Sequence, residues 1–330
     1  NAWARPARAP SGIAWEIPIV VQGGAWPFHF EVTTGPSGMT IGADLDKAQW
    51  NGSDPLGGSN ASYGVLSWSN PTVGSHSITV TITDQDGTVT TRSWTLEVID
   101  RENTTYFCFV DSVSGNNTTG TGAYSSPKLD FAGWYGTDKN DTVSQTKQIF
   151  YRAGTYNIVG VISDTILEGN ATPLNSLDSK FPQASSKPSV HVAYPGEAVV
   201  FDNNDQAFWE YQSGQDDNFF GGMSWQGCTV IENSANRKTH VRFGTNANAR
   251  TCIYDVHFIG NDDTSGSGSN PACVMFSGNP DPGSYYAIVR CHFENCDNMD
   301  FALFYDTSDV VCEYNRSSGG YVATTPGAGG

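Results

Sequence analysis

Charged residues are scarce in this sequence, and positive charge is the scarcer of the two. Only 15% of the 330 residues are charged, and 17 Lys and Arg stand against 34 Asp and Glu, for a net charge of −17. An average globular chain carries about a quarter charged residues. Because so acidic a surface repels phosphate backbones, no nucleic-acid partner is expected. No apolar run approaches the roughly 20 residues of a membrane span, so no membrane insertion is expected.

Cysteines are few and follow no metal-binding or redox pattern. The chain has seven, an odd number, with no Cys-x-x-Cys pair, and most lie within apolar, strand-like runs. Buried, reduced thiols are the first expectation, and one or two disulfides are the alternative. From these observations we expect no metal and no cofactor.

Glycine and short apolar runs are abundant instead. Gly accounts for 36 residues, hydrophobic residues for 38% and aromatic residues for 12%, which is enough to build cores in a turn-rich chain. No segment keeps a 3.6-residue period for more than about two turns. The sequence therefore predicts an all-β protein, which we divide into a lead-in (1–12), a small sandwich (13–100), a second β domain (101–323) and a flexible tail (324–330).

The first domain shows clean alternation of apolar and polar residues. Ile78, Val80 and Ile82 point to one face, and residues 94–98 repeat the pattern after the turn at residues 84–87. Short strands of this kind without helices predict a small antiparallel sandwich. With its Gly23-Gly24 turn and the run Gly64-Val65-Leu66-Ser67-Trp68, the segment resembles bacterial immunoglobulin-like or cadherin-like modules.

The second domain contains a weak repeat of apolar–polar–aromatic triplets. The triplets 256–258, 291–293 and 312–314 lie 35 and 21 residues apart, and about 21 residues make one coil of a three-sided solenoid. Parallel stacking places like residues over like. It therefore predicts two inward ladders, made of Val256, Cys291 and Cys312 and of Phe258, Phe293 and Tyr314. A second β-sandwich is the runner-up architecture.

Several further motifs point to a known fold. The segments Phe109-Val110-Asp111, Gly120-Thr121-Gly122, Gly154-Thr155-Tyr156 and Pro195-Gly196-Glu197 resemble those of the pectate-lyase-like superfamily. The resemblance implies a right-handed parallel β-helix over residues 101–323. This fold is common in phage tail spikes and tail fibres and in secreted polysaccharide lyases and glycoside hydrolases, so the resemblance implies a protein of one of these classes.

The triplet alignment also predicts an outward polar column. His257, His292 and Glu313 take its central positions, and residues in register on neighbouring strands lie about 4.8 Å apart. Such a column can supply a His/Glu acid–base pair or hold a metal, and these three are our catalytic candidates. Polar ladders on solenoid faces also arise without any chemistry. No pair of carboxylates has a spacing that marks a glycosidase.

A second set of residues suits sugar binding. Aromatic rings stack on sugars and basic groups bind their carboxylates or sulfates. The candidate set is Trp209, Tyr211, Arg237, His240 and Arg242. A solvated strand face beside a basic loop, or a contact with another chain, is the alternative interpretation.

The predicted function is that of a structural or receptor-binding fibre or spike component of a phage virion that contacts surface glycans. The alternative is a secreted carbohydrate-active enzyme, so catalysis is left undecided. Reduced thiols favour the virion protein, because a secreted enzyme is expected to pair its cysteines. The expected location is the virion surface or the extracellular space. The expected partners are a polysaccharide, other virion proteins and further copies of the chain, with a trimer implied by the resemblance.

Overall fold

The structure is a computed structural model, and the residues it describes are all-β. It describes residues 8–21, 23–25, 28–42, 63–130, 133, 148–157, 189–202, 209–211, 223–227, 229–231, 241–243, 250–259, 272–277, 285–294, 299–304, 310–313 and 315–318. Strands, turns and bends make up these segments. Within them, no helix is long and apolar enough to cross a membrane.

The first part of the chain, called the sandwich below, consists of two facing sheets. One has the strand order β1–β7–β6–β3, formed by β1 (Arg8–Pro10), β7 (Val89–Ile99), β6 (Gly74–Thr83) and β3 (His29–Thr34). The other has the order β2–β5–β4, formed by β2 (Trp15–Val20), β5 (Tyr63–Trp68) and β4 (Met39–Gly42). All pairs are antiparallel except β1 with β7, so residues expected in the lead-in form a parallel edge strand.

Alternation along the strands builds the core of the sandwich. The predicted inward residues Ile78, Val80 and Ile82 are buried, and they pack in one cluster with residues of both sheets, including Leu66 and Trp68. The predicted turn is confirmed, because β6 and β7 pair up to Thr83 and Val89. Gly87 has a φ of 82° there, a conformation that glycine adopts without strain.

The second part, called the parallel stack below, consists of three parallel sheets. The seven-stranded sheet runs β23 (Val310–Glu313), β20 (Tyr285–Val289), β17 (Arg250–Tyr254), β14 (Met223–Gln226), β11 (Ser189–Ala193), β9 (Gln148–Tyr151) and β8 (Phe107–Val110). The six-stranded sheet runs β10 (Gly154–Asn157), β12 (Val199–Asp202), β15 (Thr229–Ile231), β18 (His257–Ile259), β21 (His292–Glu294) and β24 (Arg316–Ser318). The four-stranded sheet runs β13 (Trp209–Tyr211), β16 (Val241–Phe243), β19 (Ala272–Ser277) and β22 (Met299–Phe304).

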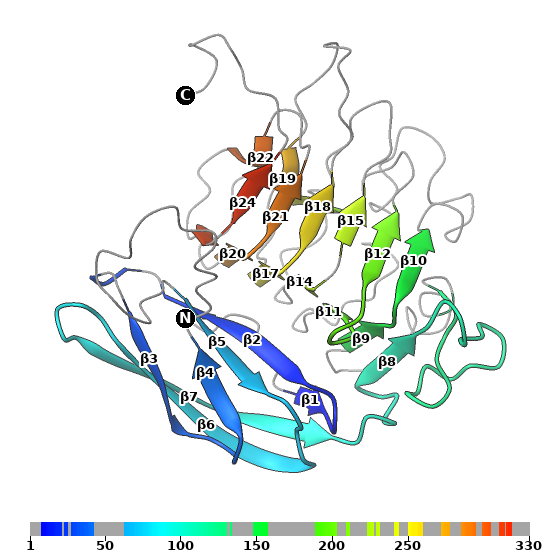
Figure 1. Cartoon of the computed structure of the whole chain (residues 1–330), viewed down its shortest axis with the longest axis horizontal. Helices are drawn as coiled ribbons and strands as arrows, with labels where there is room; N and C mark the ends of the chain where they lie inside the picture. Colours follow the sequence, from blue (N-terminus) through cyan, green and yellow to red (C-terminus); the bar gives the residue numbers. More distant parts are fainter. Residues whose placement is uncertain are drawn as a thin grey trace, which may run out of the picture.

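The chain visits the three sheets in a repeating order. From β11 onward, a strand of the seven-stranded sheet is followed by one of the six-stranded sheet and, up to β22, by one of the four-stranded sheet. The strands of the six-stranded sheet lie side by side in Figure 1. Their registers align buried aromatic rings, with Tyr156 next to Phe201 and Phe258 next to Phe293. The last two rings stack with their centroids 5.2 Å apart.

Tight corners connect the seven-stranded to the six-stranded sheet. Gly227, Asp255 and Arg290 each follow a strand of the seven-stranded sheet, and all three have a positive φ, of 70°, 54° and 57°. Non-glycine residues rarely adopt this conformation. The Arg290 Nε atom lies 3.3 Å from Asp255 Oδ1, so an ion pair links two successive corners.

Strands β8 and β9 and the described residues at the ends of β17 and β20 are buried on both faces of the seven-stranded sheet, because its outer face packs against the sandwich. Ile13 of the sandwich clusters with Phe109 and Phe150 of the stack. Farther along the sheet, Val65 clusters with Tyr254 and Val289. Figure 1 shows β2 and β5 as the sandwich strands that lie toward the stack. We call this contact the junction.

The triplet alignment is confirmed for two triplets and wrong for the third. His257 pairs with His292 and Phe258 with Phe293, and Val256 and Cys291 are buried as predicted. The residues 312–313, however, lie in the seven-stranded sheet, where Cys312 is in register with Ile288. Cys312 is exposed rather than inward, since β23 is the terminal strand of its sheet. Tyr314 lies outside the described residues.

Candidate functional site

Two of the three predicted catalytic residues meet on the six-stranded sheet. His257 on β18 and His292 on β21 are directly in register, and both are half-buried. Their imidazole rings stack with centroids 4.3 Å apart and an angle of 10° between the ring planes. Beneath them the buried Phe258 and Phe293 rings stack in the same way. The backbone register and the aromatic pair together hold the two histidines at a defined spacing.

The third member of this cluster is Glu294 and not Glu313. Glu294 lies two residues after His292, and alternation along the strand places both on the same face. Its Oε2 atom lies 2.9 Å from Nε2 of His257. On the other side, His292 Nε2 lies 2.8 Å from the hydroxyl oxygen of Ser318. The three residues His257, His292 and Glu294 are called the histidine cluster below.

The placement of Glu313 corrects the predicted column. Glu313 is in register with Val289 in the seven-stranded sheet, whereas the position next to His292 is taken by Arg316. The prediction failed because it took residues 312–314 as the next strand of the column. Val310–Glu313 form β23 of the seven-stranded sheet, and the strand next to β21 is β24, Arg316–Ser318. Alternation along β21 was the signal that could have placed Glu294 on the same face as His292, because both lie on this strand.

Three of the predicted sugar-binding residues lie on neighbouring strands of the four-stranded sheet. Trp209 is in register with Val241 and Tyr211 with Phe243, while Arg242 is in register with Glu210. Arg237 and His240 lie outside the described residues.

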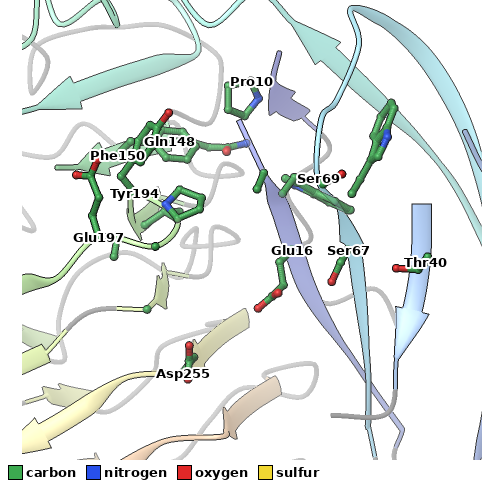
Figure 2. A pocket seen from close by; sticks show the side chains of 18 of the residues that line it. Pro10, Glu16, Thr40, Ser67, Ser69, Gln148, Phe150, Tyr194, Glu197 and Asp255 are labelled. Atoms are coloured by element: carbon green, nitrogen blue, oxygen red, sulfur yellow. The ribbon is translucent and has the colours of Figure 1, made fainter. Parts of the chain in front are cut away.

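A cleft at the junction is a second candidate site. Its volume is about 570 Å³, within the range of roughly 300–1,000 Å³ that small-molecule sites occupy. Residues of β2, β4 and β5 line one side, and the stack lines the other with β9, the loop 194–197 and two corners. Figure 2 shows Glu16 and Asp255 approaching the cleft from opposite sides, with Thr40, Ser67 and Tyr194 around it. We call it the junction cleft.

One carboxylate of the cleft ties the sandwich to the stack. The Tyr254 hydroxyl donates a hydrogen bond of 2.7 Å to Oε1 of Glu16. Burial raises the pKa of the Tyr254 hydroxyl, and the negative charge of Glu16 raises it further. Tyr254 therefore stays protonated and remains a donor, so this bond positions the Glu16 carboxylate at the edge of the cleft.

The carboxylate of Glu197 is also held in place. Arg152 Nε donates to both Glu197 oxygens at 2.9 Å, and the backbone N–H of Ala153 donates at 2.6 Å. The hydrogen bonds from Arg152 hold the pKa of Glu197 below its usual value. The same guanidinium lies 4.5 Å from the centroid of the Tyr194 ring. The motif Pro195-Gly196-Glu197 thus forms a rigid wall of the cleft.

The sequence alone did not reveal this cleft, because its two sides come from segments that are far apart in the chain. Only the motif at residues 195–197 was a signal from one side. Comparisons with protein families, with curated proteins and with solved structures find no match to this chain. The site must therefore be interpreted from its own geometry.

Proposed function

We propose that the chain is a glycan-contacting protein exposed on a virion surface or outside the cell, a fibre or spike component of a phage. The observation that supports it most directly is the junction cleft, where hydroxyl, carboxylate and aromatic groups from two rigid units converge. Sugars need such polar groups for their hydroxyls together with apolar surface. Three carboxylates, those of Glu16, Glu197 and Asp255, line the cleft. A neutral polysaccharide fits this charge better than an anionic one.

The finer fold assignment belongs to the same proposal. We assign the parallel stack to a right-handed parallel β-helix and the sandwich to an immunoglobulin-like module. The repeating order of the three sheets supports the helix. So does the in-register ladder of Tyr156, Phe201, Val230, Phe258 and Phe293, which we call the aromatic ladder because four of its five positions are aromatic. The common core of two facing sheets supports the module. Both are also what the sequence motifs resemble.

A panel of neutral and anionic polysaccharides tests the binding function. The panel is screened on an array, and any hit is measured by calorimetry with the full chain. Ser69 is exposed at the edge of the cleft, so Ser69→Trp obstructs the cleft without disturbing the core. We expect Ser69→Trp and Asp255→Asn each to weaken binding of a neutral hit by at least about tenfold, the effect of losing roughly 1.4 kcal/mol.

The variant Arg242→Ala is the matched comparison, because it tests the strand face that the sequence first suggested. We expect it to leave binding of a neutral glycan unchanged. The cleft assignment would be overturned if the chain bound an anionic glycan and this binding were abolished by Arg242→Ala but not by Ser69→Trp. Absence of binding to every glycan on the panel would overturn the function itself.

A polysaccharide-cleaving enzyme is the second candidate, and one observation favours it. His257 and Glu294 form a histidine–carboxylate pair at 2.9 Å, which is the arrangement of an oriented general base. The same panel distinguishes the two functions when absorbance at about 235 nm and new reducing ends are followed. Cleavage that His257→Ala abolishes would replace the binding function by the enzymatic one.

The oligomeric state is a further part of the proposal. A fibre or spike is expected to be a homo-oligomer, and a trimer is implied by the resemblance. The reduced thiols expected from the sequence would suit assembly in a reducing compartment. Light scattering at micromolar concentration should show a particle of three chains. A monomer under these conditions would contradict the spike assignment while leaving glycan binding to be judged by the panel.

A further inference from the structure

The histidine cluster has the chemistry and geometry of a metal site. His257, His292 and Glu294 each offer one ligand atom, and these atoms all lie within 4.8 Å of one another. A zinc ion is bound at about 2.0–2.2 Å by histidine nitrogens and carboxylate oxygens, so its ligand atoms lie about 3.3 Å apart in a tetrahedron. The pair His257 Nε2 and Glu294 Oε2 is already 2.9 Å apart.

We propose that the histidine cluster binds a divalent transition-metal ion, with Zn²⁺ as the best match. Two imidazoles with one carboxylate suit Zn²⁺, whereas Ca²⁺ and Mg²⁺ prefer all-oxygen sites. The His257 and Glu294 side chains are 33% and 38% exposed, and His292 is half-buried. Because these side chains are partly exposed, small rotations can move their ligand atoms by about an ångström. Such a movement brings ligand atoms that lie up to 4.8 Å apart to the spacing that zinc requires.

The fold holds the ligands ready for the ion. Both histidines are on neighbouring strands in direct register, and the Phe258–Phe293 pair packs below them. Ser318 bonds to Nε2 of His292 and sets the orientation of that ring. Partners of this kind orient the ligands of metal sites and raise their affinity. Three protein ligands leave a fourth zinc position for water or a ligand group, as in sites with an open position.

The backbone register places Arg316 of β24 next to His292. The site is independent of the glycan-binding proposal, because it lies on the six-stranded sheet and shares no residue with the junction cleft.

Calorimetry with ZnCl₂ on chelator-washed protein tests the site. We expect one zinc per chain, with binding weakened by more than about tenfold in His257→Ala, His292→Ala and Glu294→Gln, as losing a ligand or its partner does. His29→Ala is the matched control, because His29 is an exposed histidine of the sandwich, and it should bind zinc as the parent chain does. Far-UV circular dichroism checks that each variant is folded.

A further readout makes the result decisive. Co²⁺ in place of zinc should give visible absorption bands that are lost in His257→Ala and His292→Ala. Zinc binding that survives all three cluster variants, or no binding at about 1 mM zinc, would overturn the proposal. Neither outcome bears on polysaccharide binding at the junction cleft, which shares no residue with the histidine cluster.

Discussion

The sandwich and the parallel stack build their cores in different ways. In the sandwich, long antiparallel strands such as β6 and β7 alternate buried and exposed residues, so each strand carries its own pattern. In the stack, strands of three to six residues pair in parallel, and side chains such as Phe258 and Phe293 are buried next to like residues of the neighbouring strand. Parallel pairing therefore aligns polar residues that are distant in the chain without any local signal, and the histidine cluster is the result of this alignment.

The largest expected effect comes from breaking the aromatic ladder of the stack. Phe258→Ala should lower the free energy of unfolding by about 3–5 kcal/mol, because it leaves a cavity against Phe293. The double variant with Phe293→Ala should cost less than the sum of the two single changes, since stacked residues share their interaction. Denaturant unfolding followed by circular dichroism measures both.

Ile78→Ala in the core of the sandwich is the control for this experiment. Ile78 is fully buried and belongs to a different core cluster from Phe258. The free-energy costs of Ile78→Ala and Phe258→Ala should therefore add within about 0.5 kcal/mol. If the double variant of Phe258→Ala and Phe293→Ala lost as much free energy of unfolding as the two single variants together, the ladder would not be a cooperative unit.

The next largest effect is expected on the pH dependence of the free energy of unfolding, for which we compare a buried histidine of the stack with an exposed histidine of the sandwich. Burial lowers the pKa of His191 to about 3, against about 6.5 in an unfolded chain. Between these values the unfolded chain binds a proton that the folded chain does not, so stability falls as the pH falls from about 6.5 toward about 3. The expected slope is roughly 1 kcal/mol per pH unit.

Unfolding free energies measured from about pH 7 to about pH 4 test this slope. The hydroxyl of Tyr151 lies 3.0 Å from Nδ1 of His191, so the double change His191→Leu with Tyr151→Phe removes both partners. This double variant should reduce the slope of unfolding free energy against pH, whereas His29→Leu in the sandwich should leave the slope unchanged. An unchanged slope in the double variant would mean that other groups carry the acid sensitivity.

A smaller effect is expected at the junction, where the two regions meet. Tyr254→Phe and Glu16→Gln remove the 2.7 Å hydrogen bond between stack and sandwich. A double-mutant cycle should give a coupling energy of about 1–2 kcal/mol, because a partly buried bond to a charged group is worth more than an exposed one.

The hydrogen bond between Ser75 and Glu97 is the matched control for the junction. It is also 2.7 Å long, but it is exposed and lies within the sandwich. A cycle with Ser75→Ala and Glu97→Gln should give a coupling of no more than about 0.5 kcal/mol. Equal couplings in the two cycles would show that burial adds nothing to the bond at the junction.

The smallest effect on stability concerns the cysteines. Cys312 is exposed, while Cys108 and Cys291 are buried. Alkylation of the native protein, followed by peptide mapping, should label Cys312 and leave Cys108 and Cys291 unlabelled until the chain is denatured. Cys312→Ser should change the free energy of unfolding by less than about 0.5 kcal/mol. Rapid native labelling of Cys291 would contradict its place beneath the corner of β20 and β21.

Particular elements show how far the sequence reaches. The alternation at residues 78–98 and the turn at Gly87 were predictable, because both are local properties of one hairpin. The pairing of His257 with His292 was predictable from two similar triplets. Glu313 was misplaced because a third triplet of similar composition belongs to another sheet. Strand alternation could have placed Glu294 on the same face as His292, but it could not show that Glu294 contacts His257.

By itself, the sequence determined the all-β character, the hairpin of the sandwich and the stacking of residues 257–258 on residues 292–293. These follow from patterns with a period of two and from repeats of like residues, which short-range sterics and burial impose. Only the tertiary structure decided that Glu294 joins the two histidines, that Cys312 is exposed, and that Glu16 meets Tyr254 across the junction. These contacts depend on which strands become neighbours in a sheet and on how the sandwich packs against the stack. The residues that meet are far apart in the chain, so no local sequence pattern marks their contact.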